Sequence, residues 1–514
     1  MTHPPQSGAP VPGQQSYPGF PPPPYQGQGQ DWQPAYPPPQ PPGRGSRVLG
    51  VLGIALVVLV VVAAVGGTAY LQVGRKGATT PAYVVERENW RRVADGLTRA
   101  LAAGDEEGFV RPFAAGEVKE RQRLVFRNLL KVPWETARWE VSDSPLNGRL
   151  RVDFVHQVKD VDNLPIAEEY GWQVLPVESG TEVITGVGAV RDHQGKSLDA
   201  GYYPAPWDVY DDLSVRVRDH LVAMADKGQE AELDRDVDVL ARAAGDDLAA
   251  WQQYAPVPAD GRRGARGFFV VLEKNREVYN KLYQGDGKQD DSLEAGVNMP
   301  VVAAEGAARG TAGGAAAGGA AAGGAAAGGA AAGGGMTVGG SRIVMDTTDS
   351  RFTGSRWQDG VTDIGRHEMA HAIVATLLSE WPSPTGKGQP HDWVAEGFAE
   401  FMALRGEDAA ARDELVGDLR EVRFDGGLPG EQGEFYADTA GARSANYALS
   451  GDAVRYLAAT YGEARAFAFV AAHYARPSEY ARQLAEATGG SADAFRAAWA
   501  EHVRTTTTAA GRKK

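Results

Sequence analysis

The stretch 366–371, RHEMAH, holds the residues of this chain whose types and spacing are best suited to chemistry. In an α-helix, residues four positions apart share one face, so His367 and His371 can point both imidazoles at one metal ion. Glu368 is turned by about 100° from His367 and would lie beside the metal, where its carboxylate could accept a proton from water. The pattern predicts a zinc hydrolase centre; the alternative is a helix with two surface histidines.

The sequence around this motif favours a buried helix. Residues 360–378 read GVTDIGRHEMAHAIVATLL, and the apolar residues recur at helical spacing: Ile364, Met369, Ile373 and Leu377. Such a stripe buries one side of a helix against a core. We therefore expect a rigid helix that presents the two histidines from a fixed position.

Catalytic zinc usually takes three protein ligands and keeps one position open. The stretch HDWVAEGFAEFMALRG begins 20 residues after His371 and carries Glu396 and Glu400, four apart on one expected helix. It resembles the WxxEGxAE signature of the gluzincin metallopeptidases, the clan that includes thermolysin and aminopeptidase N. The resemblance implies that Glu396 is the third ligand and that Glu400 hydrogen-bonds a ligand histidine. His391, just before this helix, is the alternative ligand.

The resemblance also implies a tyrosine that stabilises the oxyanion of the reaction. In related peptidases this tyrosine begins a helix that reads roughly Tyr-x₈-Tyr-Leu. Here NYALSGDAVRYLAATYG places Tyr447 and Tyr456 at that spacing, followed by Leu457. Tyr447 is therefore the predicted donor, and Tyr436 is a less favoured substitute. The alternative is that Tyr447 is a core aromatic residue.

The chain departs from the aminopeptidase branch, which has a Gly-x-Met-Glu-Asn strand that binds the free amine of the substrate. The corresponding strand is expected in GGSRIVMD, residues 339–346, which lacks that motif. We therefore expect an endopeptidase rather than an aminopeptidase, and we expect this strand to be available for pairing with an extended peptide. The resemblance covers residues 209–505, a mostly helical gluzincin-like metallopeptidase domain with a small N-terminal sheet.

These residues predict a zinc-dependent metallopeptidase that acts on a peptide or protein substrate, with Zn²⁺ as its cofactor. Two alternatives remain open. One is a non-catalytic extracytoplasmic binding or sensor module with a degenerate peptidase domain. The other is a metal-dependent hydrolase of a non-peptide bond. A purely structural metal site would not need Glu368, and this favours catalysis.

Residues 83–207 predict a smaller α+β domain. Helical spacing over 88–102 and 118–130 is followed by four strand-like runs. Helices followed by a meander of strands resemble the NTF2-like superfamily, and only the order of elements carries this resemblance. His156 and His193 are expected to be ordinary strand or turn residues.

The N-terminal sequence has two further segments. Residues 1–46, rich in Pro, Gly, Gln and Tyr, are expected to be a disordered tail. Residues 48–73 are uncharged and long enough to cross a bilayer as a helix, which predicts a single-pass cell-membrane anchor with the catalytic domain outside the cytoplasm. Within 306–335, an Ala/Gly repeat predicts a flexible insertion, because glycine pairs every five residues oppose a stable helix.

Composition sets outer limits on the function. The chain has 514 residues, a net charge of −14 and no cysteine. The charge argues against a nucleic-acid partner, which needs a basic face for phosphates. The lack of cysteine excludes disulfides and thiolate ligands, so a metal must be held by His, Asp or Glu. The predicted fold class is α+β: a single transmembrane helix, a small NTF2-like domain and the gluzincin-like domain.

Overall fold

The computed structural model describes most of the chain from residue 82 onward. The described residues are 82–143, 145–175, 182–190, 204–256, 262–284, 295–307, 337–378, 388–420, 422–431, 435–437 and 439–511. The predicted tail at 1–46 and the predicted anchor at 48–73 lie outside them, as do His193 and nearly all of the 306–335 insertion.

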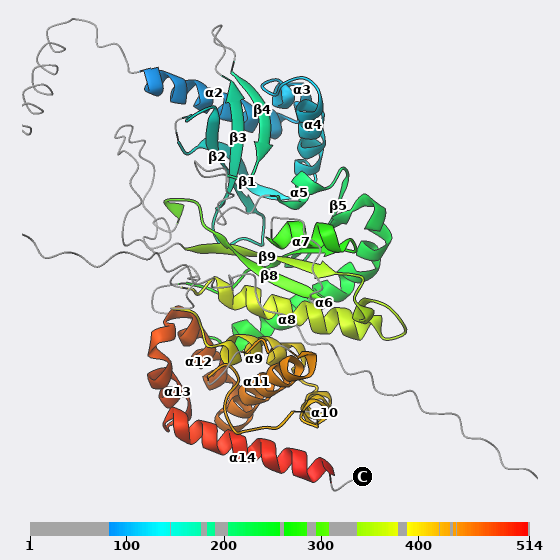
Figure 1. The fold of residues 1–514 in the computed structure, drawn as a ribbon, viewed down its shortest axis with the longest axis vertical. Coiled ribbons are helices and arrows are strands. Elements are labelled where there is room, and N and C mark those ends of the chain that lie inside the picture. The colour runs from blue at the N-terminus through cyan, green and yellow to red at the C-terminus, as the bar shows by residue number, and fades with distance from the viewer. Residues whose placement is uncertain are drawn as a thin grey trace, which may run out of the picture.

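The first described part is an α+β unit in which helices precede strands. Its elements are α2 (Ala82–Ala103), α3 (Glu106–Val110), α4 (Glu117–Leu129), β1 (Trp134–Val141), β2 (Arg149–Val158), β3 (Ile166–Leu175), β4 (Val183–Gly188) and α5 (Pro206–Val209). The four strands form an antiparallel sheet in the order β1-β2-β3-β4. We refer to residues 82–209 as the N-terminal unit. Figure 1 shows it in blue and cyan at one end of the molecule.

The second sheet is mixed and has the order β5-β6-β7-β9-β8. Its elements are β5 (Leu213–Arg218), β6 (Leu221–Asp226), α6 (Glu230–Tyr254), β7 (Phe268–Glu273), α7 (Arg276–Gln284), β8 (Gly296–Val302) and β9 (Val338–Asp346). The pairs β6–β7 and β7–β9 are parallel, whereas β5–β6 and β8–β9 are antiparallel. Because β9 has a partner on each side, it is not free to pair with a substrate peptide, contrary to our expectation. β5 and β8 are the edge strands of this sheet as the described residues form it.

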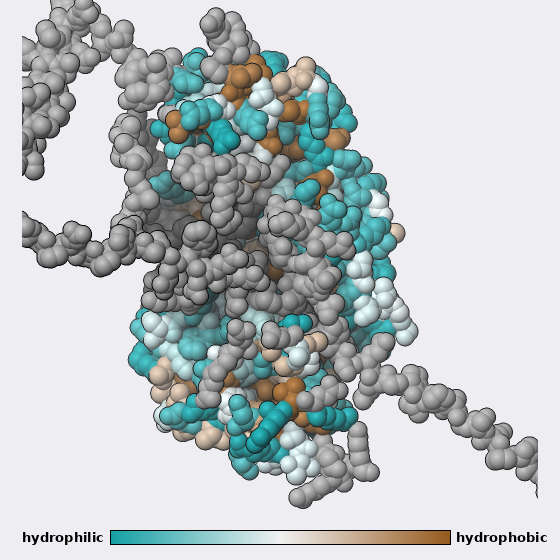
Figure 2. Space-filling view, in the orientation of Figure 1, coloured by the Kyte–Doolittle hydropathy of each residue, from teal (hydrophilic) through white to brown (hydrophobic). Residues whose placement is uncertain are grey.

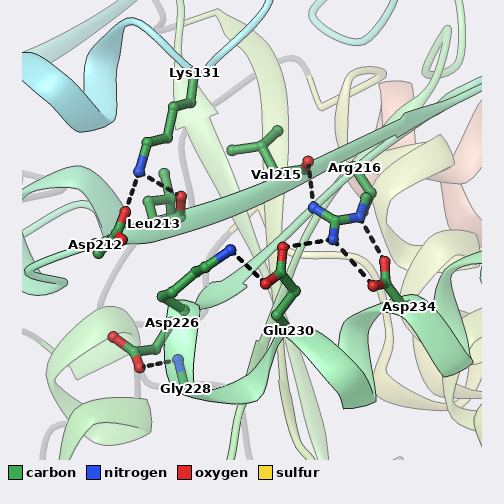
Figure 3. Close-up of polar contacts among 10 residues, drawn as sticks. Lys131, Asp212, Leu213, Val215, Arg216, Asp226, Gly228, Glu230 and Asp234 are labelled. Carbon is green, nitrogen blue, oxygen red and sulfur yellow. Dashed lines mark hydrogen bonds and ion pairs between the residues drawn. The ribbon is translucent and has the colours of Figure 1, made fainter.

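The two faces of this sheet join two different cores, because successive strand residues point to opposite sides. Val270 and Leu272 of β7 face the helices α6 and α8, while Phe269 and Val271 face the N-terminal unit. The N-terminal unit therefore packs directly onto the sheet. A polar contact supports this packing, because Lys131, just after α4, contacts the Asp212 carboxylate and the carbonyl of Leu213 (Figure 3).

Seven helices complete the described fold: α8 (Trp357–Ala375), α9 (Asp392–Ala403), α10 (Asp408–Asp418), α11 (Ala440–Tyr461), α12 (Glu463–Ala475), α13 (Tyr480–Thr488) and α14 (Ala492–Gly511). α8 lies against the sheet and against α9, and α11 packs on α9 (Figure 1). In Figure 2 hydrophilic residues dominate the described surface on this side, with hydrophobic residues in small groups. The fold thus buries α8 and α9 between the sheet and the remaining helices.

The predicted transmembrane helix needs correction. Among the described residues, no helix is both long enough and apolar enough to cross a bilayer. The long helices are amphipathic: α6, for example, buries Leu240 and Leu248 while it carries charged residues along its other side. The stretch 48–73, on which the prediction rested, lies outside the described residues. The fold class observed is mixed helix and sheet with two sheets, and the membrane anchor and membrane localisation are withdrawn.

Candidate metal centre

The helix α8 presents both histidines and the first glutamate of the motif from the interior of the protein. His367 and Glu368 are each 3% exposed, and His371 is partly exposed. The rings of His367 and His371 lie one turn apart with centroids at 4.9 Å. The alternative of two surface histidines is therefore not what the structure shows.

Two features hold α8 in place next to the motif. Gly365 allows α6 to approach closely, because a Cβ there would lie 2.9 Å from Leu240 Cδ2. Arg366 Nε donates a hydrogen bond of 2.8 Å to Asp247 Oδ1 of α6, and both side chains are buried. Burial raises the pKa of Asp247 to about 7, and the Arg366 charge opposes that rise. A buried pair of this kind fixes the rotation of the helix more than it adds stability.

The helix α9 carries Glu396 and Glu400 and crosses α11 at close range. A Cβ at Gly397 would lie 2.4 Å from the Ser450 carbonyl oxygen. A Cβ added at Gly451 of α11 would likewise lie too close, 2.8 Å from Glu400 Cβ. The glycines therefore allow backbone contact between α9 and α11, which turns both carboxylates toward α8.

Three ligand atoms converge between α8 and α9. His367 Nε2 lies 3.2 Å from His371 Nε2, and Glu396 Oε2 lies 3.1 Å from His371 Nε2 and 3.5 Å from His367 Nε2. All three atoms lie within 4.8 Å of one another, so the group could hold a metal ion. Tetrahedral zinc with bonds of about 2.0–2.2 Å spaces its ligand atoms about 3.4 Å apart, and this triangle fits that spacing.

Glu400 lies behind His367 rather than in the triangle. Its Oε1 is 3.2 Å from His367 Nδ1, on the side of the ring opposite Nε2. An N–H at Nδ1 that donates to this carboxylate leaves the Nε2 lone pair directed at the triangle. The family resemblance predicted a hydrogen bond between Glu400 and a histidine, and this 3.2 Å distance is compatible with one.

Negative charge dominates the electrostatics of the group. Burial alone lowers the pKa of His367, but hydrogen bonds from its ring to the Glu396 and Glu400 carboxylates outweigh it and raise this pKa to about 10. Burial alone raises the pKa of Glu396, but His371 and His367 more than offset it and hold this pKa below its ordinary value. The site is therefore built to stabilise positive charge in a buried position, as a cation-binding site must be.

Glu368 lies beside the triangle and is not part of it. It packs under the edge strand β8, where a Cβ at Gly296 would lie 2.8 Å from Glu368 Cγ and 2.9 Å from its Oε1. Burial raises the pKa of Glu368, and the nearby His367 and His371 oppose the rise. A buried carboxylate with a raised pKa is suited to accept and return a proton. The strand at 296–302 and its contact with Glu368 were not predicted from the sequence.

Both tyrosines named from the sequence are close to the centre, and they contact different parts of it. Tyr436 donates a hydrogen bond of 2.9 Å from its hydroxyl to Glu396 Oε1. The ring of Tyr447 lies 6.1 Å from that of His367 and 5.1 Å from that of Phe435, between centroids. Tyr436 therefore orients the Glu396 carboxylate, and Tyr447 packs beside His367.

His391 lies away from the metal group, among other partners. The backbone N–H of His391 donates to His473 Nε2 at 3.0 Å, so Nε2 accepts and the His473 proton is on Nδ1, facing Gln483 Oε1 at 3.1 Å. The His391 ring stacks on Tyr480 with centroids 4.1 Å apart. His391 and His473 thus fix the start of α9, the helix that carries Glu396.

Comparison with models of known protein families and with curated proteins finds no match to this chain. The assignment of the site therefore depends on its residues and their geometry.

Proposed function

We propose that this chain is a zinc-dependent metallopeptidase whose centre is held by His367, His371 and Glu396. The observation that carries the proposal is the convergence of these three ligand atoms within 4.8 Å, with Glu368 buried beside them and outside the ligand group. A zinc ion at this position would act as a Lewis acid and would lower the pKa of a water molecule toward about 7.

The residues of the chain have separate roles in this proposal. Glu368 accepts the proton of the attacking water and then donates it to the departing amine, so that the carboxylate is regenerated. Glu400 and Tyr436 orient His367 and Glu396 through the contacts described above. Tyr447 is the proposed donor to the oxyanion that forms on the peptide carbonyl. We expect an endopeptidase, since the chain lacks the amine-binding motif of the aminopeptidases.

The burial of Glu368 supports a catalytic role for the site over a role in metal binding alone. A carboxylate kept 97% buried needs a compensating benefit, because burial disfavours its charged form. Glu368 is not one of the three ligand residues. Glu368 lies next to the three ligand residues, where a proton acceptor would be needed. A metal-binding module without activity does not require such an acceptor.

Metal content of the purified full chain tests the first half of the proposal. Elemental mass spectrometry should find about one zinc per chain in the wild type and a loss in His371→Ala. His502→Ala removes a more exposed histidine of α14 and serves as the matched control, with zinc retained. A wild type that takes up no zinc after loading would contradict the proposal.

A peptide library tests the second half. The zinc-loaded wild type should cleave internal peptide bonds, detected by mass spectrometry of the products, and the zinc-loaded Glu368→Gln chain should not. Chelation followed by zinc addition should remove and restore cleavage. Hydrolysis of esters or epoxides with no cleavage of any peptide would contradict the peptidase assignment and leave a metal hydrolase.

A further inference from the structure

Three acidic residues follow one another at every turn along α9: Asp392, Glu396 and Glu400. The helices α8 and α9 run in opposite directions where they meet, because Glu400 lies against His367 and Glu396 lies against His371. Asp392 is therefore one turn beyond Glu396, on the side of His371. Residues four apart on a helix have Cβ atoms about 5–6 Å apart, so the carboxylate of Asp392 borders the proposed metal centre.

This end of the helix pair is the more exposed one. The His367 side chain is 4% exposed, whereas the His371 side chain is 16% exposed. Along α9, Glu400 and Glu396 are buried and Asp392 is half-buried. A substrate that reaches the centre from the more exposed side would therefore pass Asp392.

The Asp392 carboxylate has no partner among the described residues. No group donates a hydrogen bond to it, and no Lys or Arg pairs with it. Burial and the charge of Glu396 raise its pKa to about 6, so it is mostly charged at neutral pH without a compensating cation. Glu431, in a nearby turn, shows the contrast, because it accepts a hydrogen bond of 3.1 Å from Tyr480 and lies 3.6 Å from Arg496.

The groups around Asp392 leave its carboxylate uncovered. Gly430 has a φ of 82°, which favours glycine, and a Cβ there would lie 3.1 Å from Asp392 Oδ2. Tyr436 donates its hydroxyl proton to Glu396 instead. Burial, then Glu396 and Asp392, raise the pKa of Tyr474, which places its hydroxyl near both carboxylates. The described surroundings of Asp392 thus provide a glycine and two tyrosines, and no positive charge.

The start of the helix does not account for this acidic residue. Asp392 is the first residue of α9, where the helix dipole favours a negative charge. That effect lowers the pKa of a carboxyl group, whereas the pKa of Asp392 is raised. The carboxylate also accepts none of the first backbone N–H groups of the helix, so it does not act as a cap.

We propose that Asp392 binds a cationic nitrogen of the substrate, either the side chain of a Lys or Arg residue near the cleaved bond or a free terminal amine. This rests on the proposed peptidase function and names the substrate class of the same site. A cation at this position would form a charge-assisted hydrogen bond with a half-buried carboxylate. Asp392 thus determines specificity and takes no part in breaking the bond.

Paired peptides measure this preference. Each pair is based on one cleaved peptide with both ends blocked, and has lysine or its uncharged analogue norleucine at one position within two residues of the cleaved bond. The wild type should cleave the lysine peptide with a kcat/KM about 10–100-fold higher at one position, mainly through KM. A further pair has norleucine throughout and a free or acetylated N-terminus, which separates a terminal amine from a side chain.

Variants of Asp392 identify the cause of the preference. Asp392→Asn should reduce it to about threefold or less, and Asp392→Lys should instead favour glutamate over glutamine at the same position. Asp408→Asn is the matched control, because Asp408 begins α10 as Asp392 begins α9 but lies 3.4 Å from Arg455. The control should keep the wild-type preference. A preference that survives in Asp392→Asn, or that falls equally in Asp408→Asn, would overturn the proposal.

A binding measurement separates this inference from the function on which it rests. Fluorescently labelled versions of the peptides are bound to the zinc-loaded Glu368→Gln chain and followed by anisotropy. Cleavage with no preference for lysine or a free amine overturns the role of Asp392 and leaves the peptidase function intact. Binding that favours the cationic peptides about tenfold, with no cleavage by the wild type, supports the role of Asp392 and overturns the peptidase function. Absence of both binding and cleavage overturns both.

Discussion

Two buried pairs of a histidine and a glutamate can be compared directly in this protein. In the N-terminal unit, His156 Nε2 lies 3.2 Å from Glu168 Oε1, and both residues are on adjacent strands. Between α8 and α9, His367 Nδ1 lies 3.2 Å from Glu400 Oε1. The distance and the degree of burial are nearly the same, so the surroundings must account for any difference in chemistry.

The surroundings of the first pair are aromatic. The His156 ring lies 4.8 to 5.5 Å, between centroids, from the rings of Trp134, Phe154 and Trp207. Burial lowers the pKa of His156 to about 3 and raises the pKa of Glu168 to about 8. Both groups are therefore neutral at pH 7, and they behave as a polar contact inside an apolar core.

The second pair belongs to a larger group of carboxylates. Besides Glu400, His367 faces Glu396 and has Glu368 next to it in sequence, and these charges raise its pKa although burial opposes them. A second imidazole, that of His371, shares the same space. The buried pair in the N-terminal unit is thus neutral. The imidazoles and carboxylates that converge between α8 and α9 instead retain negative charge, which can bind a cation.

The test with the largest expected effect replaces one glutamate in each region. Glu368→Gln should lower kcat for peptide cleavage by about 10²–10⁴-fold with zinc retained, because it removes the proton acceptor. Glu168→Gln is the matched control and should leave kcat within a factor of two, since a neutral group replaces a neutral group. Steady-state kinetics and zinc content of both variants provide the measurement, and equal losses in the two would contradict the contrast.

The second test compares the two glutamates that face a histidine. Glu400→Gln should weaken zinc affinity by about 10–100-fold, because His367 loses the carboxylate that orients it and makes it more basic. Glu168→Gln should not change zinc affinity. Competition with a chromophoric chelator measures both constants. An unchanged affinity in Glu400→Gln would show that its contact with His367 is dispensable.

The third test uses pH. The pKa of Glu168 is raised to about 8 in the folded protein from an ordinary value of 4.5, so folding is favoured by this group below pH 4.5 and less so as pH rises through 8. From pH 5 to 8.5 the free energy of unfolding should fall by about 4 kcal/mol more in the wild type than in Glu168→Gln. Urea unfolding at both pH values measures this. His156 titrates in both proteins and cancels in the comparison.

The smallest test probes the contact that distinguishes Glu368 from the other carboxylates. Gly296→Ala places a Cβ against Glu368 and should lower kcat by about tenfold, because a small displacement of the base lengthens the proton transfer. Gly188→Ala is the control, since a Cβ at this strand glycine meets no atom within 4 Å. Circular dichroism and zinc content should be unchanged in both variants. A kcat equal to that of the wild type would show that the contact with Gly296 does not position Glu368.

Local sequence patterns were sufficient for much of the fold. The helices expected over 88–102 and 118–130 correspond to α2 (Ala82–Ala103) and α4 (Glu117–Leu129). The strand β8 was missed, because GVNMPVV is short and contains a proline. Its role as the sheet edge could not be read from the sequence either, since strand order depends on contacts between residues about 40 positions apart.

The sequence by itself determined the spacing of His367, Glu368 and His371, because the helical repeat is a local property that places residues four apart on one face. It also set the pair Glu396 and Glu400 on a second helix. Only the tertiary structure decided that these two helices meet with the ligand atoms 3.1 to 3.5 Å apart. The reason is that the meeting depends on glycine contacts between α9 and α11 and on the Arg366–Asp247 pair, whose partners are far apart in the chain.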